Sequence, residues 1–400
     1  MRNHRDGSVC VDIVITSIFN NRFANSIKTF LKFASIATLT LGSLKQPLTW
    51  AQEPISTSSA SVIQLKGIPD RGDPPVVTAM SVSPDGQWIA AAGDDHAIRI
   101  VSLRSGATRT TLQGHSDWVQ SLEFAPSGNE LASCGNDGTL RIWQLGSSPK
   151  LISTKSAEHA LLTLTYVDDS TIYAAGFGDK LYKATNNDLN LSVAHVCECK
   201  DIRSITCSPD RQMLAYGGRD GVLRIRRNQN ASSSHSGEES REASGPFDSS
   251  NELALPLHFD RIRTIRFSDD GTQITSVGED RRIVRYDLAS RSVIRKTEIG
   301  GGKLMGLCQL SENLFAIAGS DNSIRLVGSD DQMVPIKLVG HDGSVSVLRK
   351  AGDKLVSGSF DTTIRIWDIA EAIAYSKTQG RYVHPVAAQF EDSGAGDAIK

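Results

Sequence analysis

The feature that most constrains this chain is a pattern that recurs about every 41 residues between residues 75 and 370. Two copies are clear, from Val119 to Trp143 and from Val345 to Trp367. Each copy has an aspartate in the turn before its last alternating segment, and this aspartate recurs at Asp95, Asp137, Asp179, Asp220, Asp280, Asp321 and Asp361. The spacings are 42, 42, 41, 60, 41 and 40 residues. These spacings indicate seven units with one long interval, which is typical of a repeat architecture.

Each unit consists of short segments with alternating polar and apolar residues, separated by turns such as Pro84-Asp85-Gly86 and Pro126-Ser127-Gly128. This pattern predicts short antiparallel strands, about four in each unit. One such sheet cannot bury both of its faces, so successive sheets must stack, and seven can close into a ring. We therefore predict an all-β, seven-bladed β-propeller. The last unit lacks its outer strand, and we expect the N-terminal segment Ser61 to Lys66 to supply it.

The motifs Gly114-His115, Gly340-His341 and Trp367-Asp368 resemble those of the WD-repeat β-propeller family, and the resemblance covers about residues 61 to 370. It implies a buried polar tetrad of His, Ser, Asp and Trp. The positions implied are His115, Ser133, Asp137 and Trp143 in the second unit; His341, Ser357, Asp361 and Trp367 in the seventh; and a partial set of His258, Ser276, Asp280 and Tyr286 in the fifth.

These His-Ser-Asp sets are interpreted as devices for stability and not as catalytic triads. A triad occurs once, with its nucleophile exposed, whereas these sets recur at sheet spacing beside an aromatic residue. The relay from aspartate through histidine and serine to the indole N–H satisfies each buried polar group. Tyr286 is expected to keep a polar donor on the ring where tryptophan would stand.

The amino-acid composition argues against nucleic acid as a partner and against a disulfide-rich fold. With 43 basic and 45 acidic side chains the net charge is −2, so the chain has no global field that would attract nucleic acid. Its six cysteines form no CxxC motif and are too few for a disulfide framework in 400 residues. No cofactor is predicted.

The N-terminal residues have the pattern of a targeting segment. Lys28 and Lys32 precede an apolar run from Phe33 to Leu44, and small residues near Ala51 suit a signal-peptide cleavage site. This run is too short to span a bilayer, so no stable membrane insertion is expected after cleavage. We predict residues 1–51 as a signal segment, 52–60 as a linker, 61–370 as the propeller and 371–400 as a tail. The protein would be periplasmic or extracellular, or cytoplasmic if the N-terminus is not a signal.

The long interval contains residues 228–251, which are rich in Ser, Glu and Asn. Such a composition predicts a disordered insertion between the third and fourth strands of the fourth unit. A docking or regulatory role for this segment is the alternative.

His195, Cys197 and Cys199 are separated by two residues each, which would place all three on one face of an extended strand. They are a weak candidate for a zinc or copper site. No fourth ligand is visible, so the favoured interpretation is that His195 points into the sheet packing and that the chain holds no metal.

In a propeller, the loops that lead into the inner strands reach one face around the central channel. The family resemblance carries surface positions onto the residues just before each inner strand or turn aspartate. The predicted partner-binding face consists of Asp94, Trp118, Asn136, Asp201, Arg219, Arg261, Glu279, Ser320 and Phe360. Large aromatic and arginine side chains such as Trp118, Arg219, Arg261 and Phe360 dominate binding energy at interfaces.

The sequence thus predicts a non-catalytic scaffold that binds a protein or peptide at the channel face, with no nucleic-acid partner. The alternative is a propeller with a small-ligand, metal or enzymatic site on the same face. No paired carboxylates and no glycine-rich phosphate loop support that alternative.

Overall fold

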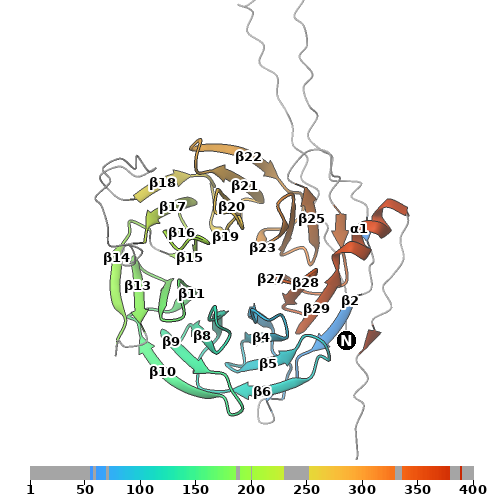
Figure 1. Cartoon of the computed structure of the whole chain (residues 1–400). Coiled ribbons are helices and arrows are strands. Elements are labelled where there is room, and N and C mark those ends of the chain that lie inside the picture. The colour runs from blue at the N-terminus through green and yellow to red at the C-terminus, as the bar shows by residue number, and fades with distance from the viewer. Residues whose placement is uncertain are drawn as a thin grey trace, which may run out of the picture. The chain divides into compact units, whose positions relative to one another are not determined.

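The computed structural model describes residues 55–56, 60–68, 72–185, 190–199, 201–228, 252–328, 336–378 and 388–389. The predicted leader of residues 1–51 and the insertion from residue 229 to 251 therefore lie outside the described residues. The described residues form seven sheets, each with four antiparallel strands, which confirms the predicted seven-bladed β-propeller. Figure 1 shows these sheets as blades around a ring, with strands such as β6, β10 and β22 on the outside.

The seven blades follow the chain in order, each running from an inner strand to an outer one. Blades 1 and 2 are β3 (Val77–Val82), β4 (Trp88–Gly93), β5 (Ile98–Ser102), β6 (Thr108–Leu112), and β7 (Val119–Phe124), β8 (Glu130–Gly135), β9 (Thr139–Gln144), β10 (Lys150–Ser156). Blades 3 and 4 are β11 (Leu161–Tyr166), β12 (Thr171–Gly176), β13 (Lys180–Thr185), β14 (Ser192–Val196), and β15 (Ile202–Cys207), β16 (Met213–Gly218), β17 (Val222–Arg227), β18 (Glu252–Pro256). Blades 5 and 6 are β19 (Ile262–Phe267), β20 (Gln273–Gly278), β21 (Arg282–Asp287), β22 (Ser292–Glu298), and β23 (Leu304–Ser311), β24 (Leu314–Gly319), β25 (Ile324–Gly328), β26 (Ile336–Leu338).

Blade 7 closes the ring. Its own strands are β27 (Val345–Ala351), β28 (Lys354–Ser359) and β29 (Thr363–Asp368), and its outer strand is β2 (Ala60–Gln64). β2 pairs antiparallel with β29, with Ile63 opposite Ile364, so the N-terminal segment closes the ring as predicted. Two-residue strands extend blades 6 and 7, where β1 (Ile55–Ser56) pairs with β26 and β30 (Ala388–Gln389) pairs with β2.

The hydrophobic core lies between neighbouring blades. Residues of blade 2 such as Leu140 and Ile142 pack in one cluster with Leu164 and Ile172 of blade 3. A comparable cluster joins Ile63 of β2 to blade 1 through Val77. Because each sheet buries its faces against two neighbours, no blade is independent of the ring.

The described part of the predicted tail contains a helix that the sequence analysis did not foresee. α1 (Ile369–Thr378) follows β29 directly, and the Asp368 carboxylate caps it by accepting a bond of 2.9 Å from the Glu371 N–H. Ile369 and Ala372 are buried in the same cluster as Trp367. The first residues of the tail therefore pack on the blade surface, where apolar residues of α1 lose contact with water.

Candidate binding face

The polar tetrads of blades 2 and 7 form continuous buried relays. In blade 2, His115 Nδ1 donates to the Asp137 carboxylate at 2.8 Å, and His115 Nε2 accepts from the Ser133 hydroxyl at 2.8 Å. Ser133 Oγ in turn accepts the indole N–H of Trp143 at 2.8 Å. In blade 7, His341 lies 2.7 Å from both Asp361 and Ser357, and Trp367 donates to Ser357 at 2.9 Å.

These relays hold the aspartates in the charged form. Burial alone would raise the pKa of Asp137, but the bond and charge of His115 and two bonds from Thr139 bring it well below its usual value. The pKa of Asp361 is lowered in the same way by His341 and Thr363, against the effect of burial. Both oxygens of each carboxylate therefore accept hydrogen bonds within their own blade, so these carboxylates are not available to bind a ligand.

Blade 5 has a shorter relay than the sequence predicts. His258 lies 2.9 Å from both Asp280 and Ser276, as in the complete tetrads. Tyr286 is buried, but its hydroxyl makes no hydrogen bond to Ser276 within the described part of the chain. Tyr286 therefore packs as a buried ring, and its hydroxyl does not extend the relay through Ser276 within the described residues.

Blades 1, 4 and 6 lack the histidine and neutralise the turn aspartate differently. Each has an arginine four residues later, on the adjacent third strand. The three pairs are Asp95–Arg99 at 2.5 Å, Asp220–Arg224 at 2.7 Å and Asp321–Arg325 at 2.6 Å. Sequence reasoning missed these arginines, although the spacing D-x-x-x-R was visible in all three units.

The predicted face residues meet in pairs at one end of the blades. In five blades the residue before the turn aspartate donates its backbone N–H to the carbonyl just before the inner strand, over 2.8–3.0 Å. The pairs are Asn136 with Trp118, Arg219 with Asp201, Glu279 with Arg261, Ser320 with Lys303 and Phe360 with Ser344. In blade 1 the Asp94 carboxylate accepts from the Val76 N–H at 3.0 Å. The two sets of positions therefore lie on the same edge of each blade.

Trp118 and Phe360 lie at the mouth of the central channel. Both line a channel of about 430 Å³, together with residues of the inner strands, and each keeps 39% of its surface exposed. Isolated exposed aromatics are ordinary, but two at one channel mouth form a surface that a partner could cover. Arg219 is also exposed, although it does not line the channel.

A network of alternating charges joins blades 4, 5 and 6 at this edge. Arg261 lies 3.5 Å from Asp201 and 3.0 Å from Glu279, and Glu279 also receives Lys303 at 2.5 Å. Burial opposes this charge on Glu279, yet Lys303, Arg263 and Arg261 lower its pKa. The network holds Arg261 in place, which reduces the entropy lost when a partner binds it.

Asp201 does not belong to an accessible face, contrary to the prediction. Its side chain is only 2% exposed, between the guanidinium groups of Arg203 at 2.8 Å and Arg261. Burying a carboxylate requires opposite charge nearby, and Arg261 comes from the next blade. Glu279, at 9% side-chain exposure, is similarly covered.

Two aromatic side chains at this edge were missed. Phe177 follows β12 and is 46% exposed, with the Arg203 guanidinium 5.0 Å from its ring centre. Phe259 follows the tetrad histidine of blade 5 and is 69% exposed, with Arg282 at 4.5 Å. The signal for Phe259 was available, because the other two tetrad units have polar Ser116 and Asp342 at that position.

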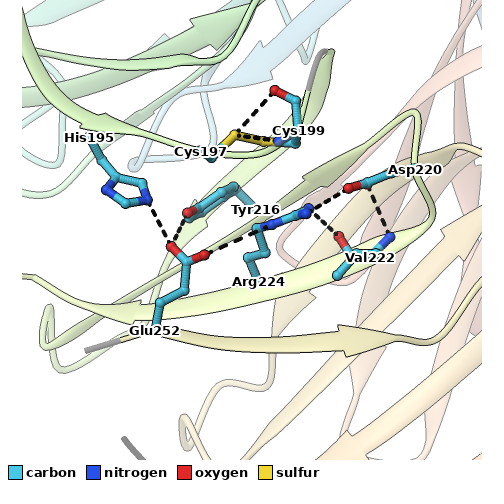
Figure 2. Close-up of a disulfide and its surroundings, with 8 residues drawn as sticks. All are labelled: His195, Cys197, Cys199, Tyr216, Asp220, Val222, Arg224 and Glu252. Atoms are coloured by element: carbon cyan, nitrogen blue, oxygen red, sulfur yellow. Dashed lines mark hydrogen bonds and ion pairs between the residues drawn. A yellow bond between two sulfur atoms is a disulfide. The ribbon is translucent and has the colours of Figure 1, made fainter. Parts of the chain in front are cut away.

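The candidate metal cluster is not formed. Cys197 and Cys199 are bonded to each other in a disulfide, so neither sulfur can act as a thiolate ligand. His195 lies instead 3.0 Å from Glu252, which also receives the Tyr216 hydroxyl and faces Arg224, as Figure 2 shows. His195 is partly exposed and hydrogen-bonded to Glu252, and does not point into the sheet packing as expected; burial lowers the pKa of its imidazole. The described residues contain no group of three or more His, Cys, Asp or Glu placed to hold a metal ion.

The fold and the channel face define a class of protein, a seven-bladed propeller built from WD-type units. The family model "WD domain, G-beta repeat" matches residues 68–102, 106–144, 190–226, 251–287 and 332–368. The chain belongs to the WD-repeat β-propeller family.

Three similar proteins illustrate the breadth of the family. "Ribosome biogenesis protein YTM1" of Phaeosphaeria nodorum is 29% identical over 158 residues, 36% of this chain and 33% of that protein. "Cell division control protein 4" of Saccharomyces cerevisiae is 44% identical over 64 residues, 16% of this chain and 8% of that protein. "U3 small nucleolar RNA-associated protein 21" of the same yeast is 27% identical over 145 residues, 36% of this chain and 15% of that protein. The matches thus span a third or less of each relative.

These names overturn the prediction of a periplasmic or extracellular protein. Ribosome biogenesis, cell division and association with nucleolar RNA are processes inside a cell. The prediction of export rested on a short, generic pattern, a pair of basic residues before an apolar run, and residues 1–51 lie outside the described residues. In the described part of the chain, no helix is long and apolar enough to cross a membrane.

Proposed function

We propose that this protein is a non-catalytic scaffold inside the cell that binds a protein or peptide partner on the face around its channel mouth. The observation that supports this most is the pair Trp118 and Phe360, both partly exposed at the mouth of one channel. Large aromatic surfaces give much of the energy of protein interfaces at a low entropy cost. The names of the three relatives describe cellular processes and not reactions, which agrees with a binding role.

The charge network supports the same face. Arg261, Glu279 and Lys303 are held by mutual ion pairs close to the channel, and the Arg203 guanidinium covers the ring of Phe177. A partner with a mixture of apolar and acidic groups would match exposed rings beside immobilised cations. The tetrads contribute rigidity alone, because their polar groups are all satisfied internally.

The test is a crosslinked pull-down from the native cells, read by quantitative mass spectrometry. The double variant Trp118→Ala, Phe360→Ala is compared with wild type and with Val293→Ala, Ile294→Ala. The control residues are 44% and 45% exposed on the outer strand β22, far along the blade from the inner strands. We expect partners enriched by wild type and by the control to fall at least about tenfold with the mouth variant. Partners that persist with a folded mouth variant would show that binding occurs elsewhere.

A further inference from the structure

Deep in the channel, below the mouth, five inner strands present a second layer of polar side chains. These are the fifth residues of β7, β11, β15, β19 and β27, and all five line the channel: Glu123, Thr165, Thr206, Arg266 and Arg349. We call these five residues the inner ring. The proposed partner-binding face does not use them, because they follow the mouth residues by several positions along each strand.

Two arginines of the inner ring carry charge that no carboxylate neutralises. Arg266 and Arg349 each fold back to donate one hydrogen bond of 2.9 Å to the carbonyl of the preceding residue. Within the described part of the chain, neither guanidinium forms an ion pair at 4.0 Å or less. Burial and the charge of Arg266 lower the pKa of Arg349 to about 10, so both groups stay charged at neutral pH. Such unpaired, partly desolvated cations are costly unless an anion joins them.

The one carboxylate of the inner ring forms its hydrogen bonds with the next blade and not with these arginines. Glu123 Oε1 accepts from the Tyr166 N–H at 3.3 Å and lies 3.5 Å from the Thr165 hydroxyl, both on the next blade. Burial raises the pKa of Glu123 to about 7, although the Tyr166 N–H and the charges of Arg266 and Arg349 lower it. At neutral pH this side chain is therefore only partly charged, and the inner ring has a net positive charge.

The chemistry of these groups selects a tetrahedral oxyanion. Each guanidinium has several N–H donors left, in a planar fork that matches phosphate oxygens, and the Thr206 hydroxyl can donate as well. The channel of about 430 Å³ has room for a phosphate group and a small substituent. We propose that the inner ring binds the phosphate group of a small molecule, either free phosphate or a phosphomonoester, between Arg266 and Arg349.

The experiment is isothermal titration calorimetry on the full chain, with inorganic phosphate, sulfate and glycerol 3-phosphate as separate probes. Arg266→Gln and Arg349→Gln are each expected to weaken binding at least about tenfold, because a charged hydrogen bond is lost. Arg104→Gln is the matched control, since Arg104 is an exposed arginine that neither lines the channel nor belongs to the partner-binding face. Glycerol 3-phosphate binding more tightly than phosphate would identify an ester as the ligand; equal binding would identify the free anion.

Glu123→Gln gives a second readout should an arginine variant fail to fold. Sulfate keeps its charge near neutrality, so its binding to wild type is expected to weaken as the pH rises through about 7, where Glu123 ionises. The other groups that face Glu123 keep one charge state there, since Arg266 and Arg349 remain cationic and the raised pKa values of Cys207, Cys308 and Tyr166 keep them neutral. The glutamine variant should bind sulfate equally well on both sides of neutrality.

Two results would overturn the proposal. One is a wild-type protein that shows no saturable heat with any of the three anions beyond that of chloride at equal ionic strength. The other is an Arg104→Gln variant that weakens binding as much as the inner-ring variants do, because the effect would then be general electrostatic attraction.

Discussion

At the scale of single residues, six of the blades bury part of a turn aspartate, and its negative charge needs a compensating group nearby. Among the described residues, blades 2, 5 and 7 supply this group with a histidine, and blades 1, 4 and 6 with an arginine four residues on. Both solutions place a positive or hydrogen-bonding group within 3 Å of the carboxylate. The blades without a tetrad are therefore not degenerate copies, because they replace one form of compensation by another.

The serine of a complete tetrad should be hard to replace. Ser133→Ala removes the acceptor of the Trp143 N–H and the donor to His115, and leaves both polar groups buried and unsatisfied. We expect a loss of about 1–3 kcal/mol in the free energy of unfolding, measured by urea denaturation. Ser116→Ala, at an exposed position beside the same relay, should change it by less than about 0.5 kcal/mol. Equal effects of the two substitutions would argue against the relay.

The aspartate–arginine pairs of blades 1, 4 and 6 lead to a second prediction. Arg99→Ala leaves Asp95 buried without its cation, since the side chains are 4% and 7% exposed. Breaking such a pair costs about 3–5 kcal/mol, which should appear as a lower urea midpoint. Arg104→Ala, at an exposed position in the same blade, should leave the midpoint unchanged. A near-neutral Arg99→Ala would mean that Asp95 is compensated in another way.

At the scale of elements, the strands and their order followed from the sequence, whereas the side chains that face the channel did not. Strict alternation would place every second residue of an inner strand on one side. All seven inner strands instead have a register shift near their second residue, as between Val119 and Ser121 in β7. The burial pattern of β7 then has half-buried Gln120, Ser121 and Glu123. This bulge cannot be recognised from the alternation of polar and apolar residues in the sequence. The sequence therefore did not show which side chains of the inner strands form the inner ring.

The same contrast holds for the candidate binding face, where the sequence indicated backbone location but not the burial of side chains. Alignment of the units could assign Trp118 and Phe360 to one edge of their blades, because position within a repeat determines backbone location; that a partner binds at this edge stays a prediction. Alignment could not show that Asp201 is buried, since its second cation, Arg261, comes from the next blade. The helix α1 was within reach of sequence reasoning, because Asp368 and Glu371 have capping-box spacing.

The closing strand β2 should contribute strongly to stability. Ile63 is buried with Val356 and Ile364 of the blade it completes. Ile63→Ala is expected to lower the free energy of unfolding by about 2–5 kcal/mol, as measured by urea denaturation. Lys66→Ala, at an exposed position just after the strand, is the control and should have almost no effect. If both variants unfold like wild type, the ring does not depend on β2.

At the scale of the whole molecule, ionisable groups set opposing limits on stability. The tetrad aspartates have lowered pKa values in the folded protein, so their contribution is present above about pH 4 and is lost as the pH falls further. Burial lowers the pKa of His341, which also disfavours folding in acid. Glu123 acts in the opposite direction, because its pKa is raised above its ordinary value.

This opposition predicts a pH-dependent effect of Glu123→Gln. Between about pH 4.5 and 7 the unfolded chain loses the Glu123 proton before the folded chain does, so wild type loses stability as the pH rises. The glutamine variant lacks this loss. Its free energy of unfolding relative to wild type should rise from pH 5 to pH 7 and level off above about pH 7, as followed by urea denaturation in a buffer series. A constant difference across the series would show that Glu123 titrates normally.

The offset between sequence unit and blade bears on how such a chain could change its length in evolution. The matched unit 332–368 contains β26 of blade 6 and the three strands β27 to β29 of blade 7, and the unit 106–144 is divided in the same way. A duplicated or deleted unit would thus always bring the outer strand of one blade with the inner strands of the next. Whatever the number of units, the last blade would still lack one strand, and β2 would still fit it. Ring size can therefore vary by gene duplication without a new closing device.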